Sequence, residues 1–175
     1  MSVLFGTSLE ELLFDAFEDE QGWIIESNHE SGKWQSWKAF QTLGTRNISV
    51  PLSDLPRRGI YSLTKSDEKY PCYIGMSCSL NGYVVDRIGK FQKHYEGDNC
   101  PHPDPHYGAL KCKQFYPELS PHSMSGFVLK VLPLHVLENI LDVKLNANST
   151  HLVVKLEDAL IDYYKSIDSN SCVGN

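Results

Sequence analysis

The sequence lacks the features that mark membrane and secreted proteins. Its apolar runs are far shorter than the roughly 18 residues that cross a bilayer, and Lys130 interrupts the run over 127–134. No basic segment followed by a long apolar stretch opens the chain, so no secretory signal is predicted. The five cysteines are odd in number and scattered, unlike the dense, even pattern of a disulfide scaffold. We therefore expect a cytoplasmic protein with reduced thiols and no membrane partner.

Internal repeats and low-complexity tracts are also missing, which excludes a solenoid or a linker-like chain. The 175 residues fit one globular domain with modest additions. Hydrophobic residues make up 41% and charged residues 22%, which is ordinary globular composition and excludes a disordered or fibrous chain.

Arginine is scarce, and charge is distributed unevenly. The formal net charge is −6, but residues 1–32 carry eight acids and no Lys or Arg. Residues 33–116 carry twelve bases and seven acids, and residues 117–175 carry four bases and seven acids. The middle segment, at +5, could present a positive surface to a polyanion although the whole chain is acidic. Uneven surface decoration without a binding role is the alternative.

The start of the chain predicts a short amphipathic helix. Ser8 and Glu11 have the spacing of a capping box, and apolar residues follow at helical spacing until Gly22. Residues 23–26 and 34–40 fit either a hairpin or a strand followed by a helix. These segments are expected to recognise a target or to make a dimer contact.

Residues 58–175 are predicted to form the core, and residues 1–57 an N-terminal extension. Two short β-type runs, 59–63 and 71–75, flank a polar stretch and predict an antiparallel hairpin, and 126–132 predicts a third strand. The expected fold is α+β, with a small three-stranded antiparallel sheet flanked by helices. Helices are expected within 80–95, 109–115 and 152–164.

Two charged residues interrupt apolar helix faces. Arg87 shares a stripe with Val84 and Phe91, and Glu157 shares one with Leu160. A charge on such a face needs an opposite charge or a bound ion. One interpretation is that the two residues pair with each other or extend to the edge of the core. The other is that Arg87 binds phosphate and Glu157 binds a metal ion.

The predicted hairpin carries the triplets GIY at 59–61 and YIG at 73–75, with eleven residues between the two tyrosines. With Arg87 on the following helix and Glu157 on a later one, this order resembles the GIY-YIG nuclease superfamily. The resemblance covers the chain from residue 59 to about residue 170 and is closest to small stand-alone type II restriction endonucleases of that superfamily. It implies a divalent-metal-dependent endonuclease that cuts double-stranded DNA at a short specific site.

The resemblance implies roles for individual residues. Arg87 would hold the scissile phosphate, and Glu157 would bind one Mg²⁺, for which Mn²⁺ can substitute. Tyr61 would position or deprotonate the attacking water, and deprotonation requires a lowered pKa because that of a free phenol is about 10. Tyr73 would orient the phosphate or the nucleophile.

Two positions depart from the family's pattern. Met76 stands where a lysine often follows the second triplet, and Phe91 stands where a histidine or tyrosine often follows the arginine. These departures motivate an alternative, a non-catalytic nucleic-acid-binding module of the same fold. They also leave the general base open, and the candidates are Tyr61, Lys90, His94, Tyr95 and His106, the last resembling the histidine before a short helix in phage homing nucleases.

Several side chains are expected to contact nucleic acid, with ordinary solvated positions as the alternative. Enzymes that cut both strands of a short site often act as two-fold dimers, so a homodimer is expected. Repair, phage and toxin nucleases of low sequence specificity share the core and form a further alternative. The predicted contacts are Arg58, Lys90, Lys93, Lys111, Lys113 and Asn170.

Overall fold

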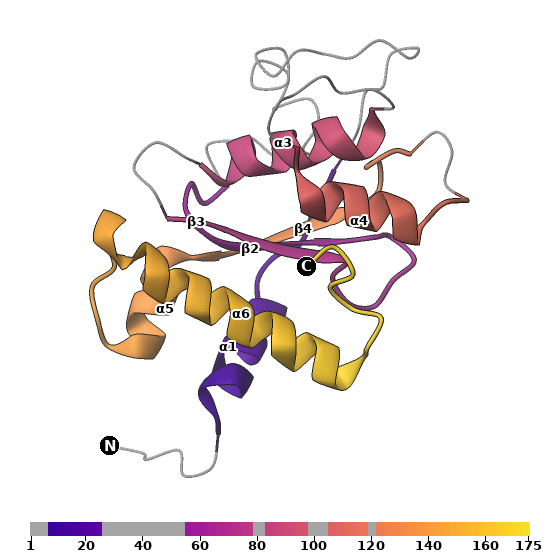
Figure 1. The fold of residues 1–175 in the computed structure, drawn as a ribbon. Coiled ribbons are helices and arrows are strands. Elements are labelled where there is room, and N and C mark those ends of the chain that lie inside the picture. Colours follow the sequence, from indigo (N-terminus) through magenta and orange to yellow (C-terminus); the bar gives the residue numbers. More distant parts are fainter. Residues whose placement is uncertain (1–6, 26–54, 79–82, 98–104, 119–121) are drawn as a thin grey trace.

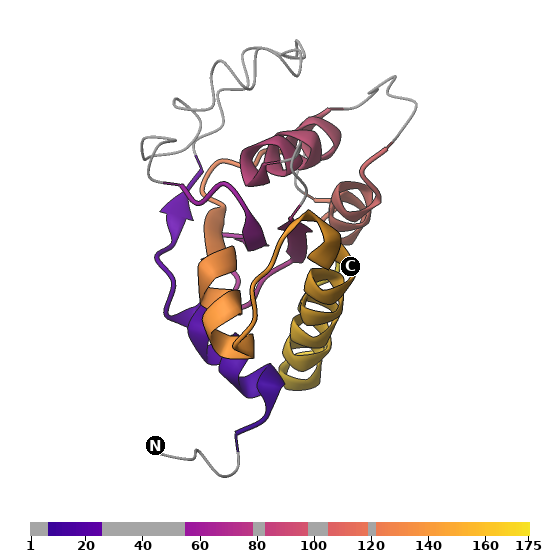
Figure 2. The same cartoon turned by 90° about the vertical axis from the view of Figure 1, so that its left-hand side faces the viewer.

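A computed structural model describes residues 7–25, 55–78, 83–97, 105–118 and 122–175. The elements in chain order are α1 (Leu9–Glu18), β1 (Trp23–Ile24), β2 (Gly59–Thr64), β3 (Tyr73–Ser77), α3 (Val84–Glu96), α4 (Tyr107–Phe115), β4 (Val128–Pro133), α5 (Leu134–Leu141), the 3-10 helix η2 (Ala147–Ser149) and α6 (Thr150–Ile167). They form three layers, in which α3 and α4 cover one face of the sheet and α1, α5 and α6 cover the other (Figures 1 and 2). No helix in these ranges is both long and apolar enough to cross a membrane.

The sheet is antiparallel and has the strand order β1-β4-β2-β3. The predicted hairpin is confirmed as β2 and β3, and the predicted third strand is β4. The prediction of only three strands is wrong, because Trp23 and Ile24 pair with Leu129 and Val128 as a fourth strand. The strand expected within residues 23–26 therefore exists, but it was assigned to the extension and not to this sheet.

The predicted helices are confirmed, with shifted ends. At the start of α1, the Glu11 N–H donates to the Ser8 hydroxyl (3.2 Å), and the Ser8 N–H donates to the Glu11 carboxylate (3.0 Å). This reciprocal pair is the expected capping box. The sequence did not predict α5, which follows β4 with no polar turn between them because Pro133 both ends the strand and caps the helix.

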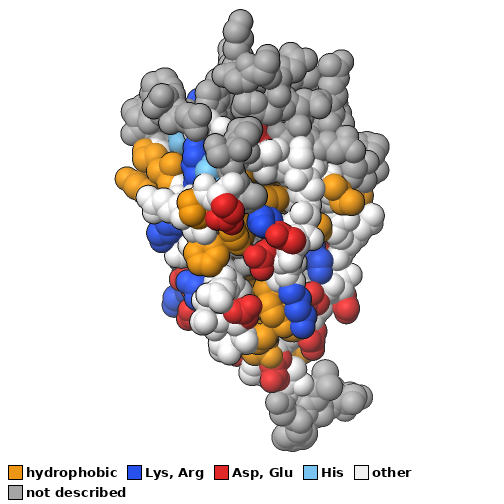
Figure 3. All heavy atoms as spheres, turned by 90° about the vertical axis from the view of Figure 1, so that its right-hand side faces the viewer, with side chains coloured by type: hydrophobic (Ala, Val, Ile, Leu, Met, Phe, Trp, Pro, Cys, Tyr) orange, Lys and Arg blue, Asp and Glu red, His pale blue; other side chains and the backbone are white. Residues whose placement is uncertain are grey.

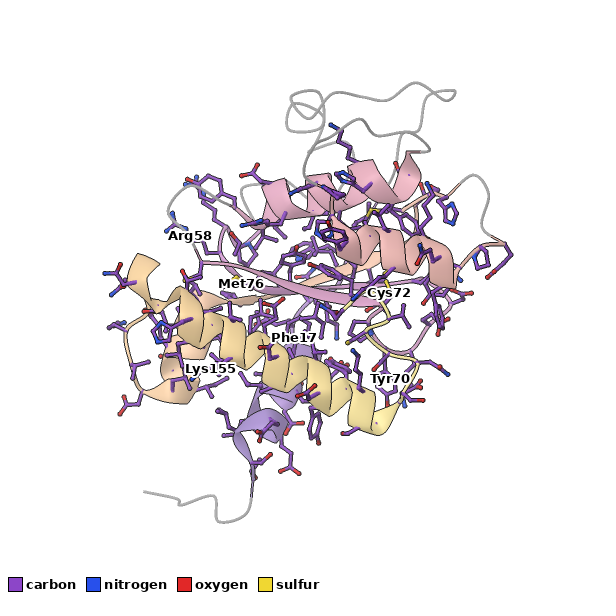
Figure 4. All side chains as sticks on the ribbon, viewed as in Figure 1. Phe17, Arg58, Tyr70, Cys72, Met76 and Lys155 are labelled. Carbon is purple, nitrogen blue, oxygen red and sulfur yellow. The ribbon has the colours of Figure 1, made fainter. Side chains whose placement is uncertain are left out.

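Two hydrophobic cores lie on opposite faces of the sheet. Because side chains alternate along β2, Tyr61 and Leu63 belong to the core under α3 and α4, whereas Ile60 belongs to the other. Leu13 and Phe17 from α1 complete the second core, and Figure 4 shows Phe17 beneath the sheet. The described part of the N-terminal extension therefore packs on the core. The remainder, including the predicted segment 34–40, lies outside the described residues.

Candidate functional site

The two sequence triplets meet across the hairpin, and their glycines make the contact possible. Tyr61 lies opposite Gly75, and a Cβ atom on Gly75 would lie 2.6 Å from the Tyr61 hydroxyl and 2.9 Å from the Tyr73 ring. Gly59 has a φ of +152°, and a Cβ there would overlap the Leu132 carbonyl oxygen. The ring centroids of Tyr61 and Tyr73 are 6.2 Å apart. The small residues of both triplets thus bring the two phenols together.

We expect Gly75→Ala to lower the free energy of unfolding by about 1–3 kcal/mol, because the added methyl group overlaps a buried ring. Urea denaturation measures this change. Ser66→Ala, at an exposed position of the β2–β3 turn, is the control and should leave the midpoint nearly unchanged. An unchanged midpoint in Gly75→Ala would contradict the close packing of Tyr61.

The Tyr73 ring is held on several sides, in part by two glycines that the sequence did not mark. Its centroid lies 5.0 Å from that of Phe91 and 5.2 Å from that of His106. A Cβ atom on Gly108 would overlap the ring, and one on Gly174 would lie 3.0 Å from it. Phe91, which departs from the family's pattern, is fully buried and supports Tyr73 by packing.

The segment after α6 lies along the outer edge of β3. The Asn175 side chain donates to the Ile74 carbonyl (2.7 Å) and accepts from the Ile74 N–H (2.9 Å). The Gly174 N–H donates to the Cys72 carbonyl (2.8 Å), and Figure 4 shows Cys72 beside this segment. Asn170, predicted to contact DNA, lies exposed in the turn before it. Asn175 was missed because no periodic pattern marks a tail residue that pairs with a strand edge.

We expect Asn175→Ala to lower the free energy of unfolding by about 1–2 kcal/mol, because it removes two hydrogen bonds to a strand edge. Asn170→Ala is the matched control, and its effect should be within about 0.5 kcal/mol. Thermal or urea denaturation compares the two variants. Equal stabilities would show that the contact with Ile74 contributes nothing.

Arg87 and Glu157 approach each other without pairing. Arg87 is exposed on α3, so the prediction that it interrupts a buried face is wrong; it lies beside the buried stripe that contains Ile88. Glu157 is half-buried on α6. Within the described ranges no ion pair joins the two, yet the Arg87 charge lowers the pKa of Glu157, Tyr61 and Tyr73. The charges of Arg87 and Glu157 therefore both act on the two tyrosines, and no salt bridge between these two residues offsets them.

Burial sets the protonation states of this group. The pKa of Glu157 is raised to about 7, first by burial and then by the neighbouring Asp158. Burial raises the pKa of Tyr61 well above its usual value and that of Tyr73 to about 12, outweighing the effect of Arg87. Both phenols therefore keep their protons at neutral pH. This favours the positioning role of Tyr61 over deprotonation of water.

We expect Glu157→Gln to melt at a higher temperature than the wild type at pH 8 in the absence of metal. The folded-state pKa of Glu157, about 7, lies above its ordinary value of 4.5. Its stabilising contribution is therefore complete below pH 4.5 and is lost as the pH rises through 7. The difference between the variants should shrink toward acidic pH. Equal melting temperatures at pH 8 would contradict the raised pKa.

Asp158→Asn is the matched control for that comparison. Asp158 is exposed on the same helix and raises the pKa of Glu157 through its charge. Its replacement should lower that pKa, so that stability is lost at a lower pH than in the wild type.

Two predicted histidines lie next to the tyrosines. His106 caps α4, where its Nδ1 accepts from the Ala109 N–H (3.2 Å), so the neutral ring carries its proton on Nε2. Burial and the charge of Lys90 lower its pKa to about 4, which leaves it neutral at pH 7. His94 is buried on α3, with Nδ1 2.8 Å from the Lys90 carbonyl oxygen, and it also lowers the pKa of His106.

The predicted nucleic-acid contacts are dispersed. Lys111 donates to the Asn175 carbonyl (3.0 Å) and Lys113 to the Gly97 carbonyl (2.7 Å), so both ammonium groups already bind the backbone. The Arg58 guanidinium lies 5.7 Å from the Tyr83 ring centroid. Lys90 and Lys93 are partly buried on α3.

The donor set fits a metal ion held by a single carboxylate. Among the residues that the structure describes, no three His, Cys, Asp or Glu side chains gather in a way that could hold a metal. Mg²⁺ usually keeps several waters and binds one or two carboxylates together with substrate phosphates. Glu157, partly desolvated and within reach of the Arg87 charge, is one such carboxylate.

No family model, curated protein or solved structure matches the chain. Its function must therefore be inferred from its own residues and their arrangement.

Proposed function

We propose that the chain is a divalent-metal-dependent endonuclease that hydrolyses phosphodiester bonds in double-stranded DNA, with a type II restriction enzyme as its leading biological role. The observation that supports this proposal is that the rings of Tyr61 and Tyr73 lie 6.2 Å apart across the hairpin, where the charges of both Arg87 and Glu157 act on them although these two residues form no ion pair with each other. A cation and a carboxylate that do not pair with each other are both able to bind a ligand, the cation a phosphate diester and the carboxylate a metal ion.

Arg87 has the chemistry to clamp the scissile phosphate. Its guanidinium is exposed, and its paired N–H donors match two phosphoryl oxygens. Because it forms no ion pair with Glu157, binding DNA would not require a salt bridge to break first. Its charge would stabilise negative charge that develops on those oxygens.

Tyr61 and Tyr73 would act as protonated hydroxyl groups. Their raised pKa values keep them able to donate hydrogen bonds at neutral pH, so they would orient the attacking water and the phosphate. Glu157 would hold Mg²⁺ or Mn²⁺, which when bound supplies positive charge to the phosphoryl and leaving oxygens. His94, His106 and Lys90 are then the candidates to accept the proton of the water.

Cleavage of plasmid and phage DNA in Mg²⁺, Mn²⁺ or EDTA tests the proposal. Discrete fragments that require metal would support a restriction enzyme. A metal-dependent smear would support a repair, phage or toxin nuclease of low specificity. Intact DNA in every buffer, with salt-dependent DNA binding, would overturn the enzymatic proposal in favour of a non-catalytic binding module.

Cutting both strands at a short site calls for two active sites, so we propose that the active species is a homodimer. Light scattering with and without DNA measures its mass. A monomer that linearises plasmid in one binding event would contradict the dimer.

A further inference from the structure

A hollow lies on the face of the sheet opposite Tyr61, between the sheet, α1 and α6, and has a volume of about 170 Å³. Figure 3 shows the molecule from the side of the β2–β3 turn, where basic, acidic and hydrophobic side chains are interspersed. None of the residues in the proposed nuclease site lines this hollow. The polar groups of its wall belong to Glu18, Ser62, Thr64, Lys69, Lys130 and Tyr164.

Ser62 contributes a buried polar group to the wall of the hollow. It lies opposite Lys130 and Ile74 in the sheet, at a position where the neighbouring side chains of the same face are mostly apolar. Its side chain is 1% exposed, and its Oγ has no hydrogen-bond partner among the described residues. A buried hydroxyl without a partner is unfavourable. A ligand bound in the hollow that Ser62 lines would supply such a partner.

The charges around the hollow do not balance. The Glu18 carboxylate accepts from the Tyr164 hydroxyl (2.5 Å) and forms an ion pair with Lys130 (3.4 Å), so these charges offset each other. The Lys69 ammonium lies 5.0 Å from the Tyr70 ring centroid, and no carboxylate of the described ranges pairs with it. The mouth of the hollow therefore keeps one positive charge.

We propose that this hollow binds a small oxyanion, either inorganic phosphate or a small carboxylate. The Ser62 and Thr64 hydroxyls, two residues apart on one face of β2, and the Lys69 ammonium supply donors to the hollow. An oxyanion would give the buried Ser62 hydroxyl an acceptor and offset the charge of Lys69. The volume suits such an ion but is well below the 300 Å³ or so of an ordinary drug-sized site.

Thermal melting and calorimetry with sodium phosphate or sodium acetate, at constant ionic strength set by chloride, test the proposal. The Arg87→Met protein is used without DNA or divalent metal, so that the nuclease site does not contribute and the two proposals can fail independently. We expect a saturable rise in melting temperature with at least one of the two anions. Phosphate alone, or acetate alone, would identify the class of ligand.

Two variants locate the binding. Ser62→Ala and Lys69→Met should each weaken the affinity by about tenfold or more, because hydrogen bonds to a charged group are lost. Ser62→Ala should fold normally, since it removes a hydroxyl that has no partner in the protein. Lys155→Met, at an exposed α6 position that does not line the hollow, is the control and should bind as the parent does (Figure 4). No saturable rise with either anion, or equal affinity in all variants, would overturn the proposal.

Discussion

Replacing Arg87 with methionine is expected to reduce the cleavage rate by about 10³-fold, because an arginine that stabilises the phosphoryl oxygens acts mainly in the transition state. Arg87→Lys keeps the charge but loses the paired donors, so its rate should fall between those of Arg87→Met and the wild type. Single-turnover cleavage of one plasmid at saturating protein measures the rates without contributions from DNA affinity.

Arg57→Met is the matched control for Arg87. Arg57 is also exposed and basic, but its guanidinium lies 5.6 Å from the Tyr83 ring centroid, whereas the charge of Arg87 is among the main influences on the pKa of both tyrosines of the site. Its replacement should weaken DNA binding slightly and leave the single-turnover rate within about threefold of the wild type. If both arginine variants lose the same modest activity, Arg87 is only one more basic contact to DNA.

The second large effect is expected from Glu157→Gln, which removes the metal-binding carboxylate but keeps the size of the side chain. The Lewis-acid contribution of a bound divalent ion is several kcal/mol, so the cleavage rate should fall by at least about 10²-fold. Metal titrations at fixed DNA concentration measure the loss. DNA binding in EDTA should persist, since the phosphate contacts do not depend on this carboxylate.

Asp158→Asn separates the role of the Glu157 carboxylate as a metal ligand from the effect of negative charge on α6. Asp158 is the exposed neighbour of Glu157, so its replacement removes the same charge from the same helix without removing the ligand. This variant should retain cleavage. A loss equal to that of Glu157→Gln would show that the charge of α6, and not the Glu157 carboxylate itself, supports the reaction.

The hairpin and the main helices could be predicted because their patterns are local. The short apolar runs that contain Ile60 and Ile74 indicate the two strands of the hairpin. The helical spacing of Val84, Ile88 and Phe91 indicates α3. Residues 23–26 were expected to form a strand, but their place in this sheet could not be predicted, because the pairing with β4 joins distant parts of the sequence. The α5 helix was missed because no turn signal separates it from β4.

Only part of the candidate site could be predicted from the sequence. The sequence shows directly the order of the four site residues, Tyr61, Tyr73, Arg87 and Glu157. It does not show that Arg87 is exposed, because a residue at the edge of the apolar face of a helix is buried or exposed according to what packs beside it. The contact of Asn175 with the edge of β3 and the unpartnered Ser62 hydroxyl arise from tertiary neighbours alone. A serine in a strand has no sequence signature that distinguishes a buried position beside a hollow from a solvated one.

Conversion of supercoiled plasmid by the wild-type and Glu157→Gln proteins, purified in parallel and assayed in the same Mg²⁺ buffer, tests the central claim most directly. We predict that the wild type nicks and linearises the plasmid, that EDTA stops the reaction, and that the variant leaves the DNA supercoiled while it still binds. Equal conversion by both proteins, or no conversion by a wild type that binds DNA in either Mg²⁺ or Mn²⁺, would contradict the assignment of this site to phosphodiester hydrolysis.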